Sequence, residues 1–402
     1  MANYNAIRGR LVQSLSSDPT LTSAYEGQVW YNSTESKLKG LVKLEAWSSG
    51  APLINLTNNG AGAGTQTAGL TFGGRNPPGP AFVGTTEEYN GSGWSAGGAL
   101  STARSYLAGF GTQTAAVAAG GRTDASGTTT NATEEYDGSS WTTVNNMGTA
   151  RRVGGDAGIV QTAGLAIGGG PPGVTTTEHY DGTNWTSGGA LNTARFYLAG
   201  FGTLTSAVAA GGNGGESAVE EYDGSSWTSA TSLGTGRTQL GSSGSSETDG
   251  IVFGGEAPGP TVKADAESYD GTSWTEGPNL ATARRGLSGS SGHSQTAALA
   301  SAGFPTYNLT EEFNSSINAI TAGAWASGAN YPTDIQDAAG SGPVTASVIY
   351  GGYDGPAYVG LTNEYNGTAY SSSNPMGTAR ACYNTGAGSQ TAALQASGYA
   401  TS

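Results

Sequence analysis

The sequence predicts an all-β fold, in which about eight copies of one repeat, each roughly 45 residues long, form the four-stranded blades of a β-propeller. Three observations support this prediction. Tryptophans recur along the chain at nearly constant intervals, a tight-turn signal precedes most of them, and a short apolar run ending in small residues precedes each turn signal. Glycine makes up 68 of the 402 residues, as many short strands and tight turns require.

The tryptophans belong to a hairpin pattern. An aromatic residue lies five positions before most of them, and Asp-Gly or Asn-Gly follows that aromatic, as in EEYDGSSW at 134–141. Asp-Gly and Asn-Gly accept the positive φ of tight hairpin turns, so we expect an antiparallel hairpin whose aromatics pack on neighbouring blades. The tryptophan positions of the repeats are Trp47, Trp94, Trp141, Trp185, Trp227, Trp274, Trp325 and, in the eighth copy, Tyr370.

Short apolar runs such as TAGLTFGG are predicted to be the buried inner strands. Their small residues suit blades that narrow toward a central channel, and Gly-Gly allows the backbone to turn sharply where the strand ends. The eight runs are 67–74, 114–121, 162–169, 206–212, 250–255, 296–303, 346–352 and 391–398.

With its Gly-Gly doublet, then Tyr, then Trp, the repeat resembles the kelch repeat over about residues 40 to 399. The resemblance implies a propeller with four strands per blade. Seven units run complete from inner strands to the tryptophan position. We expect GLVKLEAW at 40–47 and TAALQASG at 391–398, from opposite chain ends, to join in an eighth blade, with seven blades as the alternative. Such closure leaves no unpaired sheet edge.

Charged residues repeat with the blades. An arginine lies ten residues after most of the tryptophan positions, and a glutamate lies two residues before most of the tyrosines, on the face of the strand that the buried aromatic occupies. A buried carboxylate needs a partner, so we expect structural ion pairs, although each arginine could pair within its own blade or with the preceding blade's glutamate. The members that complete pairs within a blade are Arg104, Arg151, Arg195, Arg237, Arg284, Glu134, Glu178, Glu220, Glu267 and Glu311. The functional alternative is a carboxylate-binding ring of arginines.

The sequence predicts a protein that is not an enzyme and has no cofactor or metal. Copper radical oxidases with kelch repeats need paired histidines and a Tyr-Cys crosslink, but here His179 and His293 fall in different blades and Cys382 is the only cysteine. A glycoside hydrolase needs an acid and a nucleophile at one site, and acids outside the repeat pattern, such as Asp334 and Asp354, show no such organisation.

Net charge limits the choice of partners. The formal net charge is −14, whereas proteins that bind nucleic acids gather Lys and Arg on one surface. No apolar run is long enough for a membrane span, and the N-terminus lacks an apolar signal-peptide core. We therefore expect neither nucleic-acid binding, nor membrane insertion, nor signal-peptide-dependent export.

The connections between the second and third strands of the blades differ greatly between copies, whereas the hairpin turns barely vary. Variable connections at one end of a propeller are typical of a recognition surface, although neutral drift would leave the same pattern. The aromatics most available there to stack on sugars are Phe82, Tyr307, Tyr353 and Tyr358.

Residues 1–39 lie outside the repeats and are predicted to be an attachment segment, with the propeller at 40–402. The stretch EGQVWYNSTESKLKG at 26–40 reads as a β-hairpin and resembles a motif of virion proteins of tailed, especially marine, bacteriophages. The resemblance implies a structural protein of the virion (tail fibre, appendage or head decoration) that is assembled in the host cytoplasm. Other virion proteins would then be its partners, and a host-surface glycan or receptor its ligand, in a chain that could form a homo-oligomer. The alternatives are a cytoplasmic kelch adaptor and a carbohydrate-active enzyme.

Overall fold

The computed structural model describes residues 13–18, 29–35, 37–212, 216–289, 294–322, 331–341, 346–366, 368–381 and 386–395. All regular secondary structure in these residues is β, which confirms the predicted class. The chain divides into two compact units, unit 1 (Met1–Thr34 with Lys39–Thr321) and unit 2 (Glu35–Leu38 with Ala322–Ser402). The predicted division into 1–39 and 40–402 stays a prediction.

Unit 1 contains five four-stranded antiparallel sheets, each built from one continuous stretch of chain. Sheet 1 is β4 (Ala61–Gly64), β5 (Gly69–Phe72), β8 (Thr86–Tyr89) and β9 (Trp94–Gly97), and sheet 2 is β10 (Ala108–Thr112), β11 (Ala115–Ala119), β12 (Thr133–Tyr136) and β13 (Trp141–Val144). Sheet 3 is β14 (Gly155–Val160), β15 (Ala163–Ile167), β16 (Thr177–Tyr180) and β17 (Trp185–Ser187). Sheet 4 is β18 (Ala199–Thr203), β19 (Ser206–Ala210), β20 (Val219–Tyr222) and β21 (Trp227–Ala230), and sheet 5 is β22 (Gly241–Ser246), β23 (Asp249–Phe253), β26 (Ala266–Tyr269) and β27 (Trp274–Glu276). Two small hairpins, β6 (Arg75–Asn76) with β7 (Ala81–Phe82) and β24 (Glu256–Ala257) with β25 (Thr261–Val262), lie between second and third strands.

Sheet 6 combines distant parts of the chain. Its strands, in spatial order, are β28 (Ser288–Gly289), β29 (Ala297–Ser301), β30 (Thr310–Ala322), β3 (Lys37–Ser49), β2 (Val29–Asn32) and β1 (Gln13–Leu15). Backbone hydrogen bonds from Gly50 N to Thr310 O and from Leu53 N to Asn308 O extend this pairing. An N-terminal strand therefore takes the fourth position of sheet 6, which the last strand of the same continuous stretch holds in sheets 1 to 5.

Trp47 explains this pairing. Each of the first five sheets places its tyrosine beside its own tryptophan, as with Tyr136 and Trp141, whose ring centroids are 4.9 Å apart. In sheet 6 the aromatic is Phe313, and Trp47 on β3 lies 5.2 Å from it and 5.0 Å from Phe253 of sheet 5. Trp325, which the repeat pattern placed in this position, lies outside the described residues.

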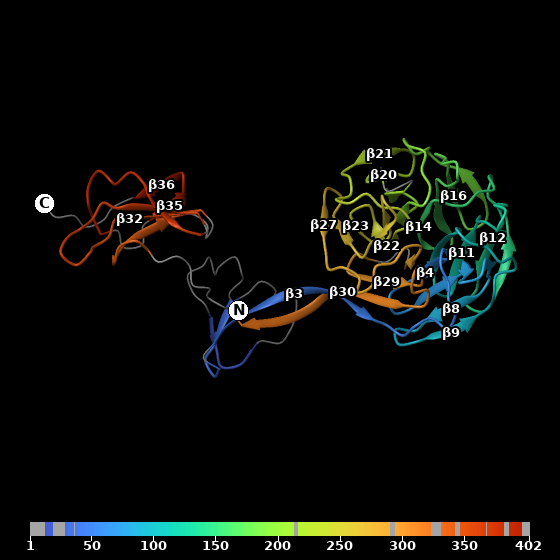
Figure 1. Cartoon of the computed structure of the whole chain (residues 1–402), viewed down its shortest axis with the longest axis horizontal. Coiled ribbons are helices and arrows are strands. Elements are labelled where there is room, and N and C mark those ends of the chain that lie inside the picture. The colour runs from blue at the N-terminus through green and yellow to red at the C-terminus, as the bar shows by residue number, and fades with distance from the viewer. Residues whose placement is uncertain are drawn as a thin grey trace. The chain divides into compact units, whose positions relative to one another are not determined.

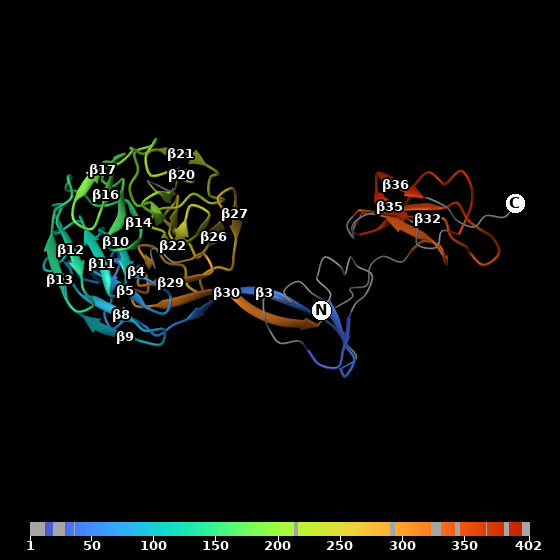
Figure 2. The same ribbon diagram turned by 180° about the vertical axis from the view of Figure 1, so that it is seen from behind.

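The first strands of the six sheets lie side by side around one centre (Figures 1 and 2). Each packs on the first strand of the next sheet, and β28 of sheet 6 packs on β4 of sheet 1. This arrangement supports the predicted β-propeller architecture. The predicted count of eight blades is not confirmed.

The predicted closure of the eighth blade is wrong. Residues 40–47 were expected to pair with 391–398, but β3 lies between β30 and β2, while β36 (Ala392–Gln395) pairs with β35 (Gly386–Ser389). The physical reason is the sequence after Phe313, which lacks the Asp/Asn-Gly turn. Without that turn β30 continues as a long strand, and its open edge accepts β3.

The predicted inner strands are confirmed. All eight apolar runs contain a strand, and in unit 1 these strands are the second strands of their sheets. Leu70 and Phe72 of β5 and Val117 of β11 are almost fully buried. The glycines that follow turn the chain, since Gly73 and Gly74 have φ of 66° and 104°, a region that favours glycine.

Unit 2 contains the last two repeats. One four-stranded sheet consists of β31 (Ala339–Ser341), β32 (Ser347–Tyr350), β33 (Thr362–Tyr365) and β34 (Tyr370–Ser372), and β35 with β36 forms a hairpin. Gln390 Nε2 donates to the carbonyls of Ser347 and Tyr365 at 3.3 and 3.0 Å. Gln113 makes the equivalent bonds between sheets 2 and 1, so unit 2 repeats a contact that joins neighbouring blades in unit 1.

The N-terminal hairpin is also present. β2 and β3 are neighbours with a turn at residues 33–35 between them, while residues 26–28 and 36 of the predicted hairpin lie outside the described part. Asp18 accepts hydrogen bonds from Trp30 Nε1 (3.0 Å), Asn32 Nδ2 (2.8 Å) and Lys39 Nζ (2.6 Å). The bonds from Lys39 and Asn32 lower the pKa of Asp18 to about 2, so at neutral pH this carboxylate holds the hairpin together.

Candidate functional site

The repeated arginines and glutamates form ion pairs inside single sheets. The bonded nitrogen and oxygen are 2.8 Å apart in Arg104–Glu134, 2.9 Å in Arg195–Glu220, 2.5 Å in Arg237–Glu267 and 2.8 Å in Arg284–Glu311, and Arg151 pairs with Glu178. Each arginine lies just before the first strand of a sheet, and its glutamate lies on the third strand of the same sheet. The pairs therefore join the loop between two blades to the second of those blades.

The surroundings of the pairs indicate a structural role. Arg195 is fully buried and also donates to the carbonyls of Gly211 and Ala218 at 2.9 and 2.8 Å. The second oxygen of Glu220 accepts the Asn192 backbone N–H at 2.6 Å. Hydrogen bonds to other protein groups thus engage both the arginine and the glutamate. We therefore assign these arginines to the framework and not to a carboxylate-binding ring.

A second contact between sheets was not anticipated from the sequence. The tyrosine hydroxyl of one sheet hydrogen-bonds to the side chain of the residue that precedes the aromatic in the previous sheet, and it donates where that residue is a glutamate. The pairs are Tyr136–Glu88 (2.6 Å), Tyr180–Glu135 (2.8 Å), Tyr269–Glu221 (2.6 Å), Tyr222–His179 (2.7 Å) and, between sheets 1 and 6, Tyr89–Glu312. Where Phe313 lacks the hydroxyl, the facing position is Ser268 and not an acid. This joint loss was visible in the repeats and could have revealed the contact.

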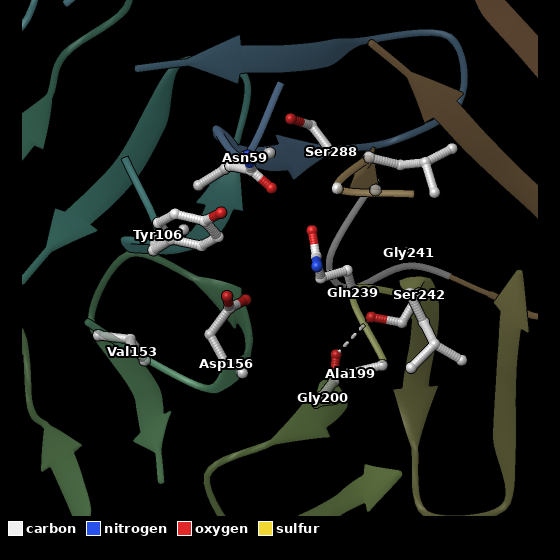
Figure 3. A pocket seen from close by; sticks show the side chains of 18 of the residues that line it. Asn59, Tyr106, Val153, Asp156, Ala199, Gly200, Gln239, Gly241, Ser242 and Ser288 are labelled. Carbon is white, nitrogen blue, oxygen red and sulfur yellow. Dashed lines mark hydrogen bonds between the residues drawn. The ribbon is translucent and has the colours of Figure 1, made fainter. Parts of the chain in front are cut away.

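The six sheets share a central pocket with a volume of about 100 Å³. The starts of all six first strands line it, and Figure 3 shows Asn59, Tyr106, Asp156 and Gln239 around it. Backbone hydrogen bonds run around the pocket, from Tyr106 N to Asn59 O, Val153 N to Tyr106 O, Gln239 N to Tyr197 O, Gly286 N to Gln239 O and Asn59 N to Gly286 O. The last of these joins sheet 1 to sheet 6.

Asp156 is a carboxylate in this pocket. At the equivalent position the other first strands have Gly62, Gly109, Gly200, Gly289 and Ser242, so this acid is specific to sheet 3. Burial raises the pKa of Asp156 to about 8, although the Gly109 backbone N–H acts in the opposite direction. The side chain therefore keeps its proton near neutral pH.

We expect Asp156→Asn to stabilise the protein increasingly as the pH rises. The unfolded carboxyl ionises near 3.8 and the folded one near 8, so the folded state binds more protons between these values, and stability falls with rising pH. The asparagine variant loses this dependence, and its melting temperature should exceed that of the wild type more at pH 9 than at pH 5. Thermal unfolding at both pH values tests this, with the exposed-carboxylate variant Glu276→Gln as control. An equal difference at both pH values would contradict the assignment.

Two tyrosines at the pocket occupy an unfavourable backbone region. Tyr106 and Tyr197 have φ of 55° and 60°, which is uncommon for a bulky residue. The equivalent positions Asn59, Gln239 and Gly286 share this backbone, with φ of 54°, 53° and 62°, so the positive φ recurs around the pocket and only glycine accepts it without strain. Strained residues concentrate at functional sites, and the two rings lie 5.1 Å apart at the pocket.

Cations gather beside these tyrosines. Arg152 lies 5.8 Å from the Tyr106 ring centroid, and its NH1 donates to the Tyr197 hydroxyl at 3.4 Å. Burial and Tyr197 raise the pKa of Tyr106 to about 12, whereas Arg75 and Arg152 act in the opposite direction. The Tyr106 hydroxyl is therefore neutral at physiological pH.

The predicted binding aromatics are found in both units. Two guanidiniums contact Phe82, since Arg75 and Arg122 are each 5.6 Å from its ring centroid. Tyr307 lies 5.9 Å from Phe304. Tyr353 and Tyr358 lie 5.5 Å apart in unit 2, so the predicted set divides between the two units.

Neither a protein-family model nor a curated protein sequence matches this chain. Within the described ranges, no helix is long and apolar enough to cross a membrane. In the same part of the chain, no group of three or more His, Cys, Asp or Glu side chains is placed to hold a metal ion.

Proposed function

We propose that unit 1 is a closed six-bladed propeller and that the protein is a non-enzymatic structural component of a bacteriophage virion. In this proposal the chain belongs to a tail fibre, an appendage or a head decoration, and it binds a glycan or receptor on the host surface. The contacts of sheet 1 with sheet 6, through Tyr89–Glu312, Asn59–Gly286 and β4 against β28, support the closed ring.

The observation that supports binding is the difference between the two ends of unit 1. The end with the hairpin turns repeats the same Asp-Gly or Asn-Gly geometry, as Asp137 and Asp223 show by accepting the N–H groups of their own turns. The opposite end, which we call the loop face, consists of the connections between second and third strands and between sheets. Aromatics, arginines and the pocket lie there.

Catalysis is less well supported. Of the residues that line the central pocket, Asp156 is the only one with a carboxylate, whereas most glycoside hydrolases use two. The repeated glutamates of the ion pairs are already bonded to arginines, so they are not free to act as catalytic acids. A cytoplasmic kelch adaptor remains the second candidate, since variable loops would also suit a protein partner.

The virion assignment predicts that mass spectrometry finds this chain in purified phage particles, and its absence would contradict the assignment.

For host binding, we expect Tyr307→Ala with Tyr353→Ala to weaken attachment of the full chain to host cells, because both aromatics lie in variable connections. The control is Val160→Ala, which changes an exposed apolar residue at the turn end. Unchanged attachment of the double variant would exclude these two aromatics from binding.

A further inference from the structure

Unit 1 gathers its unburied cations at one end, where the acids Asp124, Glu216, Glu256 and Asp265 also lie. Between residues 50 and 309, the cations other than the five paired arginines are Arg75, Arg122, Arg152, Lys263 and Arg285, and all of them lie in connections of the loop face. The hairpin turns of the opposite end contain Asp137, Asp181, Asp223, Asp270 and Glu247. A chain of net charge −14 thus gathers its unburied positive charge on one face.

Three of these arginines have no carboxylate partner among the described residues. Arg122 donates to the backbone carbonyls of Asp124 and Ala125, and Arg152 donates to a tyrosine hydroxyl. Arg75 has a buried Nε atom with no hydrogen-bond partner in the described part of the chain. Arg285 differs, because Glu256 lies 3.3 Å from it. Positive charge without a counter-charge favours an anion at this place.

The three arginines form one cluster with aromatics. Arg75 and Arg122 lie over Phe82, the Arg122 backbone pairs with Ser105 beside Tyr106, and Arg152 lies over Tyr106 and reaches Tyr197. We call Arg75, Phe82, Tyr106, Arg122, Arg152 and Tyr197 the rim, because its two tyrosines line the central pocket. Guanidiniums bind carboxylates, sulfates and phosphates with paired hydrogen bonds, and tyrosine adds a flat apolar ring with a hydroxyl donor.

We infer that the rim binds an anionic glycan, a sugar chain that presents carboxylate, sulfate or phosphate groups, with the acidic group on the arginines and a sugar ring against the tyrosines. This inference rests on the proposed function, since it specifies the ligand class of the loop face. Two aromatic rings 5.1 Å apart at one pocket would have little use in a purely electrostatic contact. The rim therefore fits a sugar with an acidic group better than an acidic surface alone.

The test uses the full chain and a panel of immobilised oligosaccharides in matched pairs, such as tetragalacturonic acid with its methyl ester and sulfated glycans with their desulfated forms. We expect the acidic member of at least one pair to bind about tenfold or more tightly than its neutral form, because charge-assisted hydrogen bonds are lost. Raising the salt concentration should weaken this binding. Vesicles of phosphatidylglycerol provide a lipid source of the same anionic chemistry, and we expect weaker binding to them.

Matched variants locate the binding. Arg122→Gln and Arg152→Gln should each weaken binding to the acidic glycan by about tenfold. Lys263→Gln removes a positive charge from the same face outside the rim and should leave binding unchanged. Thermal unfolding checks that all three variants are folded.

The outcomes separate this inference from the proposed function. If the chain attaches to host cells but prefers neutral glycans, binds no glycan in the panel, or binds the vesicles more tightly than every glycan, the inference is wrong and host binding stands. Acidic-glycan binding that survives both rim substitutions also overturns it. If the chain attaches to no host cell, the proposed recognition role itself fails.

Discussion

Arg195→Ala is expected to lower the free energy of unfolding by about 3–5 kcal/mol, because removing one partner of a buried pair leaves the other charge uncompensated. Arg195 is fully buried, and its bond to Glu220 is 2.9 Å long. Burial lowers the pKa of Arg195 and the nearby Glu220 raises it, so desolvation and pairing oppose each other at this site. Urea or thermal unfolding measures the change.

The controls separate the ion pair from other effects. Arg152→Ala removes an arginine of the same face that has no carboxylate partner, and we expect a much smaller loss of stability. The double variant Arg195→Leu with Glu220→Leu removes both charges together, and it should be less destabilised than Arg195→Ala. Unchanged melting of Arg195→Ala would disprove a structural role for the pair.

Trp47→Ala is expected to destabilise the protein by about 3 kcal/mol, at the lower end of the range for losing a large aromatic from a core. The side chain is half-buried and packs between Phe253 of sheet 5 and Phe313 of sheet 6. Its loss would loosen the strand that completes sheet 6. The change in unfolding midpoint measures the effect.

Trp47→Phe is the conservative control. It keeps an aromatic ring, and the lost indole N–H has no hydrogen-bond partner in the described residues, so we expect most of the stability to remain. Trp325→Ala tests the competing assignment made from the repeat pattern. If Trp325→Ala destabilises the protein while Trp47→Ala does not, the pairing of β3 with β30 is wrong.

Local features were predictable because they depend on residues close in the chain. The turns at Asp137-Gly138 and Asp223-Gly224 and the strands of the eight apolar runs follow from local backbone preference and burial. The existence of the ion pairs also followed from the repeats, since the copy with Ile335 in place of arginine has Asn363 in place of glutamate. The sequence could not choose between pairing within a sheet and between sheets, because both have regular spacing.

The candidate site was only partly predictable. Phe82 was identified from its place in a variable connection, and it lies in the rim. Arg75, Arg122 and Arg152 were not identified, because each is an isolated residue of a different connection and only the arrangement of the sheets brings them together. The strain at Tyr106 and Tyr197 has no sequence signal, since a positive φ at a tyrosine is imposed by its surroundings.

By itself, the sequence determined the repeat, the strand class, the hairpin turns and the residue types that pair inside each blade, because short-range periodicity encodes all of these. Only the tertiary structure decided which strand completes sheet 6 and which side chains meet at the pocket. Both depend on contacts between residues far apart in the chain, such as Trp47 with Phe313 and Arg152 with Tyr197. Such contacts form because an open strand edge and an unpacked aromatic must find partners, and spacing along the chain does not say which partners lie near.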